Sequence, residues 1–140
     1  MNFHLRAAVM AALVGLCGFT GGRAEAQTIY FDVHSVAMRS GESLELGQVY
    51  AIGLTCKSLL TAKPEVEIMD GPPGVTAFIR DEPVVPRSVG CAKPVDGGKL
   101  LISTGHIDDY SKTRMVLRIK MKTKNGDRQY SRDVNVTLFP

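Results

Sequence analysis

The chain has 140 residues and a formal net charge of +3, with 22% charged and 6% aromatic residues. This length is enough for one compact domain and not comfortably for two. Beyond the first 26 residues there is no long apolar run, which argues against a membrane span in the remaining 114 residues.

Residues 1–26 have the pattern of a secretory signal. A short basic start precedes an apolar run over residues 7–19, and Ala24-Glu25-Ala26 fits the small-x-small rule for cleavage. We therefore expect an exported protein, periplasmic or secreted, whose single domain covers residues 27–140. An uncleaved membrane anchor is the alternative. A lipid anchor is not expected, because a leucine rather than a small residue precedes Cys17.

Removal of the signal would leave two cysteines, Cys56 and Cys91. In an oxidising compartment an even pair most simply forms a disulfide. Closing a loop of this length would stabilise the fold by roughly 4 kcal/mol in the chain-entropy model. Two buried free thiols are the alternative.

The first strand-like segments change their alternation along the chain. Apolar residues over residues 28–38 switch parity near His34-Ser35, which predicts either a bulge or a strand that passes from one sheet to another. Apolar residues from Leu44 to Cys56 share one parity, with a local turn or bulge at Gly47-Gln48. Cys56 is therefore expected to point inward at the end of a core strand.

Shorter strands are predicted at residues 65–69, 75–79 and 99–104, separated by glycine and proline turns. Residues 81–96 contain three prolines and cannot form an interior strand throughout. This proline-rich stretch is expected to run extended along a sheet edge, fixed by Cys91.

Two long alternating runs fill residues 113–139 and are joined by Asn125-Gly126. Asn-Gly favours a two-residue type I′ turn. With these two residues as the loop, Lys124 faces Asp127 and Leu117 faces Val134, so that the apolar residues of both strands share one face.

Seven to nine short strands with turn signals every eight to twelve residues, and no convincing helix, predict an all-β, antiparallel sandwich. From Glu65 to Leu138 the spacing also resembles that of immunoglobulin-like and cadherin-like modules of exported bacterial proteins. The shared pattern includes Leu100-Leu101-Ile102 after a glycine-rich turn and a final Val-x-Val-x-Leu strand that ends at Leu138. The resemblance implies an immunoglobulin-like fold and implies no activity.

Basic side chains concentrate in the last quarter of the chain. Residues 112–140 carry eight basic and two acidic side chains, whereas residues 27–111 carry seven basic and eleven acidic ones. We call four alternating residues the basic stripe: Arg114, Arg118, Lys120 and Lys122. A stripe of one sign on an outward strand face can attract an envelope protein, an acidic glycan or a lipid headgroup. Protection of an exposed sheet edge is the alternative.

Nucleic acid is not an expected partner, because the chain is predicted to be exported and the stripe has no interleaved aromatic residues. His34 and His106 lack the ligand spacing of a metal site, so neither metal nor cofactor is expected. No nucleophile elbow or phosphate-binding glycine loop is present, which argues against an enzyme.

These observations predict an exported, non-catalytic binding or structural module of the cell envelope or the extracellular space. One alternative is an inhibitor or accessory subunit of another exported protein, acting through the proline-rich stretch. A hydrolase or metal-binding protein built from loop residues is the second alternative.

Overall fold

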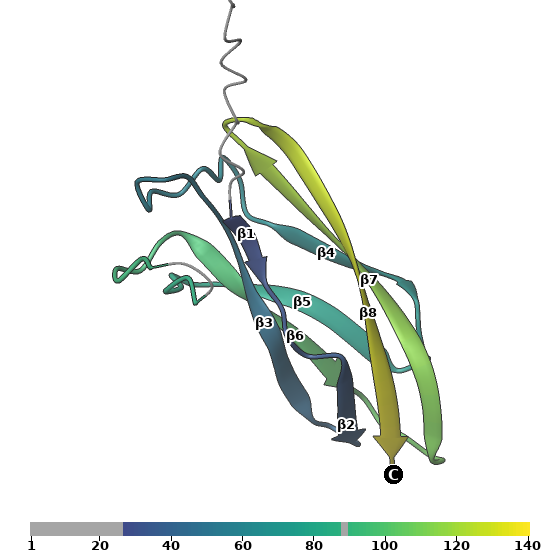
Figure 1. The fold of residues 1–140 in the computed structure, drawn as a ribbon. Helices are drawn as coiled ribbons and strands as arrows, with labels where there is room; N and C mark the ends of the chain where they lie inside the picture. Colours follow the sequence, from purple (N-terminus) through teal and green to yellow (C-terminus); the bar gives the residue numbers. More distant parts are fainter. Residues whose placement is uncertain (1–26, 88–89) are drawn as a thin grey trace, which may run out of the picture.

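The computed structural model describes residues 27–87 and 90–140, which form two packed four-stranded sheets (Figure 1). The predicted signal, residues 1–26, lies outside the described residues. Sheet 1 has the strand order β1-β3-β6-β5 and sheet 2 the order β2-β8-β7-β4. The strands are β1 (Gln27–Tyr30), β2 (Ser35–Arg39), β3 (Ser43–Ile52), β4 (Glu65–Asp70), β5 (Val75–Asp81), β6 (Gly97–Thr104), β7 (Ser111–Thr123) and β8 (Gly126–Phe139).

The predicted all-β sandwich is confirmed, and the strand order is that of an immunoglobulin-like fold. The chain passes from sheet 1 to sheet 2 between β1 and β2, which is the sheet switch expected near His34-Ser35. β2 pairs parallel with β8, and the other strand pairs are antiparallel. Within the described residues, no helix is long and apolar enough to cross a bilayer.

The inner faces of the two sheets form the main core. β7 contributes every second residue from Met115 to Met121, and all four of these side chains are essentially inaccessible to water. They pack with Leu100 and Ile102 of β6 and with alternate residues of β8. The two-residue period that predicted the strand therefore also identified its buried face.

The β7–β8 hairpin has a different register from the predicted one. Thr123 pairs with Gly126 and Leu117 with Arg132, so the predicted pairing of Leu117 with Val134 is wrong by two residues. A type I′ turn needs two positive φ angles. Here Gly126 has a φ of +109° and Asn125 does not have a positive φ, which fits a type I turn followed by a glycine bulge. Because a shift of two preserves side-chain parity, the predicted faces are retained.

β3 does not keep one parity along its length. The register shifts between Glu45 and Gly47, so the expected bulge is present. Beyond it, Val49 faces the main core, whereas Tyr50 and Ile52 belong to a second buried cluster on the outer side of sheet 1. The prediction that the apolar residues from Leu44 to Cys56 share one parity and one inward face was therefore wrong.

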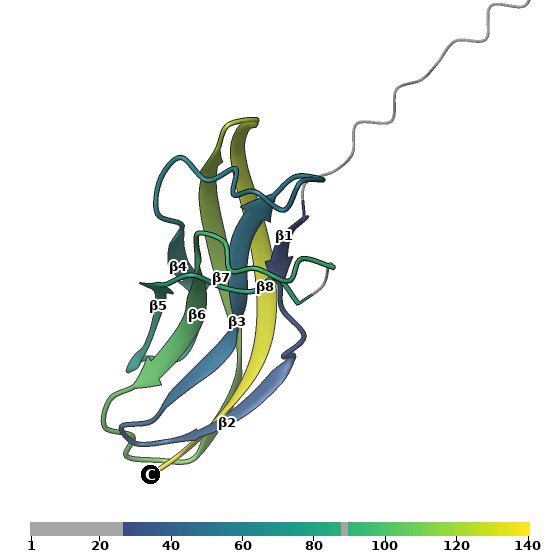
Figure 2. The ribbon, with the colours of Figure 1, turned by 90° about the vertical axis from the view of Figure 1, so that its left-hand side faces the viewer.

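The β5–β6 connection covers this second cluster. Val84 and Val95 pair through two backbone hydrogen bonds and pack with Tyr50, Ile52 and Cys91. Figure 2 shows the connection crossing the outer side of β6 and β3. The proline-rich stretch thus lies across a sheet face, not along an edge as predicted, because Tyr50 and Ile52 on the outer face need cover from water.

Gly97 permits this close packing. A Cβ at this position would lie 2.5 Å from the Val49 carbonyl oxygen and 2.9 Å from Cγ2 of Val84. Gly97→Ala is therefore expected to destabilise the fold by about 1–3 kcal/mol, measured by denaturant unfolding. Gly90→Ala is the control, since its Cβ would meet no atom within 4 Å. Equal unfolding midpoints for the two variants would contradict this packing.

Candidate functional site

The predicted disulfide is present and lies outside the strands. Cys56 and Cys91 have Cα atoms 5.7 Å apart and join the β3–β4 connection to the β5–β6 connection. Cys56 follows the end of β3, has a φ of +55° and packs against the second cluster, so its predicted position in the inter-sheet core was wrong. The disulfide therefore fixes two connections to each other at the outer side of sheet 1.

The β3–β4 connection is also fixed to the β7–β8 turn. The Leu59 amide donates to the Ala51 carbonyl at 2.7 Å, and the Lys124 amide donates to the Leu59 carbonyl at 2.8 Å. Leu60 and Thr123 form an isolated bridge beside them. We call residues 53–63 and 120–129 together the loop end. Figures 1 and 2 place it at the opposite end of the sandwich from the C-terminus.

The basic stripe lies on the outward face of β7. Because β7 is paired with β4 on one side and β8 on the other, it is an interior strand of sheet 2. The alternative interpretation of the stripe as edge protection was therefore wrong for Arg118 and Lys120. A sheet edge needs charged guards because its backbone groups are unpaired, whereas β4 pairs with β7 from Val116 to Lys120 and so covers β7 beside Arg118 and Lys120.

Three of the four stripe residues contact carboxylates. Arg114 lies 2.6 Å from Asp133, and Glu67 accepts from Arg118 at 3.2 Å and from Lys120 at 3.3 Å. Exposed pairs of this kind add little stability, but they cancel much of the local field. Within the described part of the chain, Lys122 has no ion pair.

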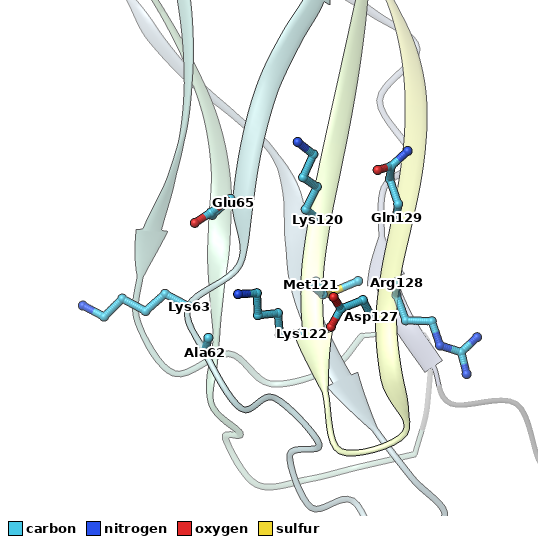
Figure 3. A pocket seen from close by; sticks show the side chains of 9 residues that line it. All are labelled: Ala62, Lys63, Glu65, Lys120, Met121, Lys122, Asp127, Arg128 and Gln129. Carbon is cyan, nitrogen blue, oxygen red and sulfur yellow. The ribbon is translucent and has the colours of Figure 1, made fainter.

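A pocket of about 230 Å³ opens at the loop end, between the start of β4 and the turn end of the hairpin. Figure 3 shows Lys122 and Asp127 between Lys63 and Arg128, whose side chains extend in opposite directions. The pocket is lined by Ala62, Lys63, Glu65, Lys120, Met121, Lys122, Asp127, Arg128 and Gln129. The pocket therefore combines a buried apolar side chain, Met121, with a predominantly basic rim.

The cations at this pocket differ in their partners. Lys63 lies 2.8 Å from Asp81, and Lys120 is held by Glu67. Among residues 27–87 and 90–140, Lys122 and Arg128 make no ion pair. Two of the four basic side chains at the pocket can therefore attract an external anion without first leaving a carboxylate of the protein.

The outer face of sheet 1 neutralises its own charges. Glu82 lies 2.7 Å from Arg80 and 3.3 Å from Lys99, which also contacts Glu45 at 3.3 Å. The hydrogen bond from Arg80, followed by that from Lys99, holds the pKa of Glu82 below its ordinary value. The neighbouring Glu45 and then Glu82 raise the pKa of Lys99. These four side chains therefore form a balanced ion network of two cations and two carboxylates.

The residues considered for metal binding or catalysis do not assemble into a site. His106 lies 3.0 Å from Asp108 on an exposed loop, whereas Met38, the methionine that follows His34 in the sequence, is buried in the main core. In the described ranges, no group of three or more histidine, cysteine or acidic side chains could hold a metal ion. The Thr104 hydroxyl donates to the Arg39 carbonyl at 2.6 Å, so it has a structural partner.

No protein-family model matches this chain. No curated protein shows significant sequence similarity to it either.

Sequence reasoning included Lys122 in the candidate site but missed its neighbours at the loop end. Lys124 and Arg128 flank the Asn-Gly turn, so their clustering with Lys122 was visible in the sequence. Lys57 is more than sixty residues away along the chain and only the fixed β3–β4 connection brings it to the same end. The hairpin cations had a local signal, whereas Lys57 had none.

Proposed function

We propose that this chain is an exported, non-catalytic binding module of the cell envelope or the extracellular space that holds an anionic partner with its loop end. The observation that carries the proposal is the gathering of cations without carboxylate partners at one end of the sandwich. Among the described residues, the loop-end cations without an ion pair are Lys57, Lys122, Lys124 and Arg128. The export half of the proposal rests on the signal-like segment at residues 1–26.

The loop end is a better candidate than the full basic stripe. An anion that approaches Arg114, Arg118 or Lys120 meets a cation whose charge a neighbouring carboxylate already balances. At the loop end Lys122 lies opposite Asp127 across the hairpin without an ion pair among the described residues, and the fixed connection holds the cations together before binding. A preorganised group of like charges attracts anions over about 8 Å at physiological salt.

An inhibitor or accessory subunit acting through the proline-rich stretch has less support. Val84, Pro86 and Val95 in that stretch are buried, so much of it serves to cover sheet 1. A loop-built hydrolase or metal protein also has less support, since His106 and Asp108 contact each other on an exposed loop without a further ligand in the described chain.

Binding to heparin, a soluble polyanion, tests the proposal. The variant Lys122→Gln/Lys124→Gln/Arg128→Gln is expected to bind at least about threefold more weakly at low salt, since each exposed charge contact contributes about 0.2–1 kcal/mol. Binding of the unaltered protein is expected to fall as salt rises toward 1 M, where the Debye length is about 3 Å. A salt-titrated heparin binding assay measures both effects.

The matched control removes the same charge from the other end of sheet 2. Arg39→Gln/Lys112→Gln/Arg114→Gln is expected to bind heparin nearly as well as the unaltered protein, because these residues lie away from the loop end. Equal losses in the two triple variants would mean that net charge alone governs binding. That result would refute the loop end as the site.

A further inference from the structure

One large apolar side chain projects from the loop end. Leu54 is 89% exposed and lies in the turn that the Cys56 amide closes by donating to the Gly53 carbonyl at 3.2 Å. It is the most exposed large apolar side chain among those of the described residues. A leucine in this position contributes nothing to the core, and its apolar surface is accessible to a binding partner.

The turn that carries Leu54 is held at its base. Ile52 and Ser58 form a bridge that closes the loop, and the Ser58 hydroxyl donates to the Asp96 carbonyl at 3.3 Å. The disulfide fixes Cys56, the last residue of the turn, to the β5–β6 connection. The loop that carries Leu54 is therefore held in place before binding, so that less chain entropy is lost when Leu54 meets a partner.

Cations lie in the same loop and on the neighbouring β7–β8 hairpin. Lys57 is exposed in the same loop, and Lys124 is joined to the loop through its backbone bond to Leu59. Lys122 and Arg128 continue the basic surface along the hairpin and make no ion pair within the described residues. An apolar tip with a basic rim is the combination that binds the interface of a membrane with anionic lipids.

We propose that the loop end docks on an anionic lipid surface, with Leu54 entering the boundary between headgroups and acyl chains and the cations facing the headgroups. This inference rests on the proposed function and names the class of its anionic partner. Charge alone would fit an acidic glycan equally well, but a glycan has no apolar layer to receive Leu54. The protruding leucine therefore favours a bilayer over a purely polar polyanion.

Vesicle co-sedimentation with the chain from residue 27 onward tests the proposal. The unaltered protein is expected to bind vesicles that contain phosphatidylglycerol and to bind pure phosphatidylcholine vesicles at least tenfold more weakly. Leu54→Ser is expected to reduce binding to the anionic vesicles roughly tenfold, because a buried leucine side chain is lost from the interface. Met69→Ser, which alters a partly exposed apolar residue of β4, is the control and should bind normally.

A fluorescent variant measures insertion directly. The chain contains no tryptophan, so Leu54→Trp introduces a single reporter at the tip. Its emission is expected to shift to shorter wavelength on anionic vesicles and to stay unchanged with heparin. Unchanged emission on anionic vesicles, or equal vesicle binding by the unaltered and Leu54→Ser proteins, would overturn the membrane inference.

The heparin assay separates the two proposals. Heparin binding that depends on the loop-end cations, without vesicle binding, would refute the membrane partner and leave the anion-binding function in place. If the unaltered protein binds neither heparin nor anionic vesicles, the proposed function itself is refuted.

Discussion

Leu117→Ala is expected to lower the free energy of unfolding by about 2–5 kcal/mol. Leu117 is fully buried at the centre of β7, where it packs in the main core between the two sheets. Its truncation removes apolar contacts and leaves a cavity between the two packed sheets. The neighbouring strands cannot readily close this cavity, because hydrogen bonds hold each strand within its sheet. Denaturant unfolding of both proteins measures the difference.

Lys120→Ala on the same strand is the control. Lys120 faces outward, and its contact with Glu67 is a partly exposed ion pair, so its loss should cost less than about 1 kcal/mol. Comparable destabilisation by the two substitutions would contradict the assignment of inward and outward faces on β7.

Reduction of the disulfide is expected to cost about 2–4 kcal/mol and to lower the melting temperature by several degrees or more. The bond joins positions 35 residues apart, so reduction returns considerable freedom to the unfolded chain. It also breaks the disulfide that joins the β3–β4 connection to the β5–β6 connection, which covers the second cluster. Thermal unfolding with and without reductant measures the change.

Cys56→Ala/Cys91→Ala provides the matched control. In this variant the melting temperature should already be low and should not respond to reductant. A melting temperature equal to that of the oxidised protein would show that the bond adds no stability.

The alternation on β7 was predictable because a half-buried strand repeats over neighbouring residues. The hairpin register was not, since Asn-Gly is compatible with more than one turn and the backbone chose a single positive φ at Gly126. β3 shows the same limit: the bulge near Gly47 was expected, but which side chains it would turn outward depended on the β5–β6 connection that covers Tyr50.

The candidate site was only partly predictable for a similar reason. The outward direction of Lys120 and Lys122 follows from parity, whereas the neutralisation of Lys120 depends on Glu67, which pairing between β4 and β7 brings from more than fifty residues away. Long-range strand order also decides that β7 is interior and needs no edge guards. Neither the ion pair of Lys120 with Glu67 nor the interior position of β7 can be read from a single sequence, because both depend on which strands are neighbours.

The parallel pairing of β2 with β8 has a mechanical consequence. Five consecutive residue pairs, from Ser35 with Asn135 to Arg39 with Phe139, join the first strand of sheet 2 to the last strand of the chain. Both strands run toward the end opposite the loop end, so the chain enters the pair at the start of β2 and leaves it at the end of β8 (Figure 1). Tension between the two ends would pull these strands past each other along their length and load their hydrogen bonds together, so that the sandwich resists stretching in shear and cannot be unzipped one bond at a time.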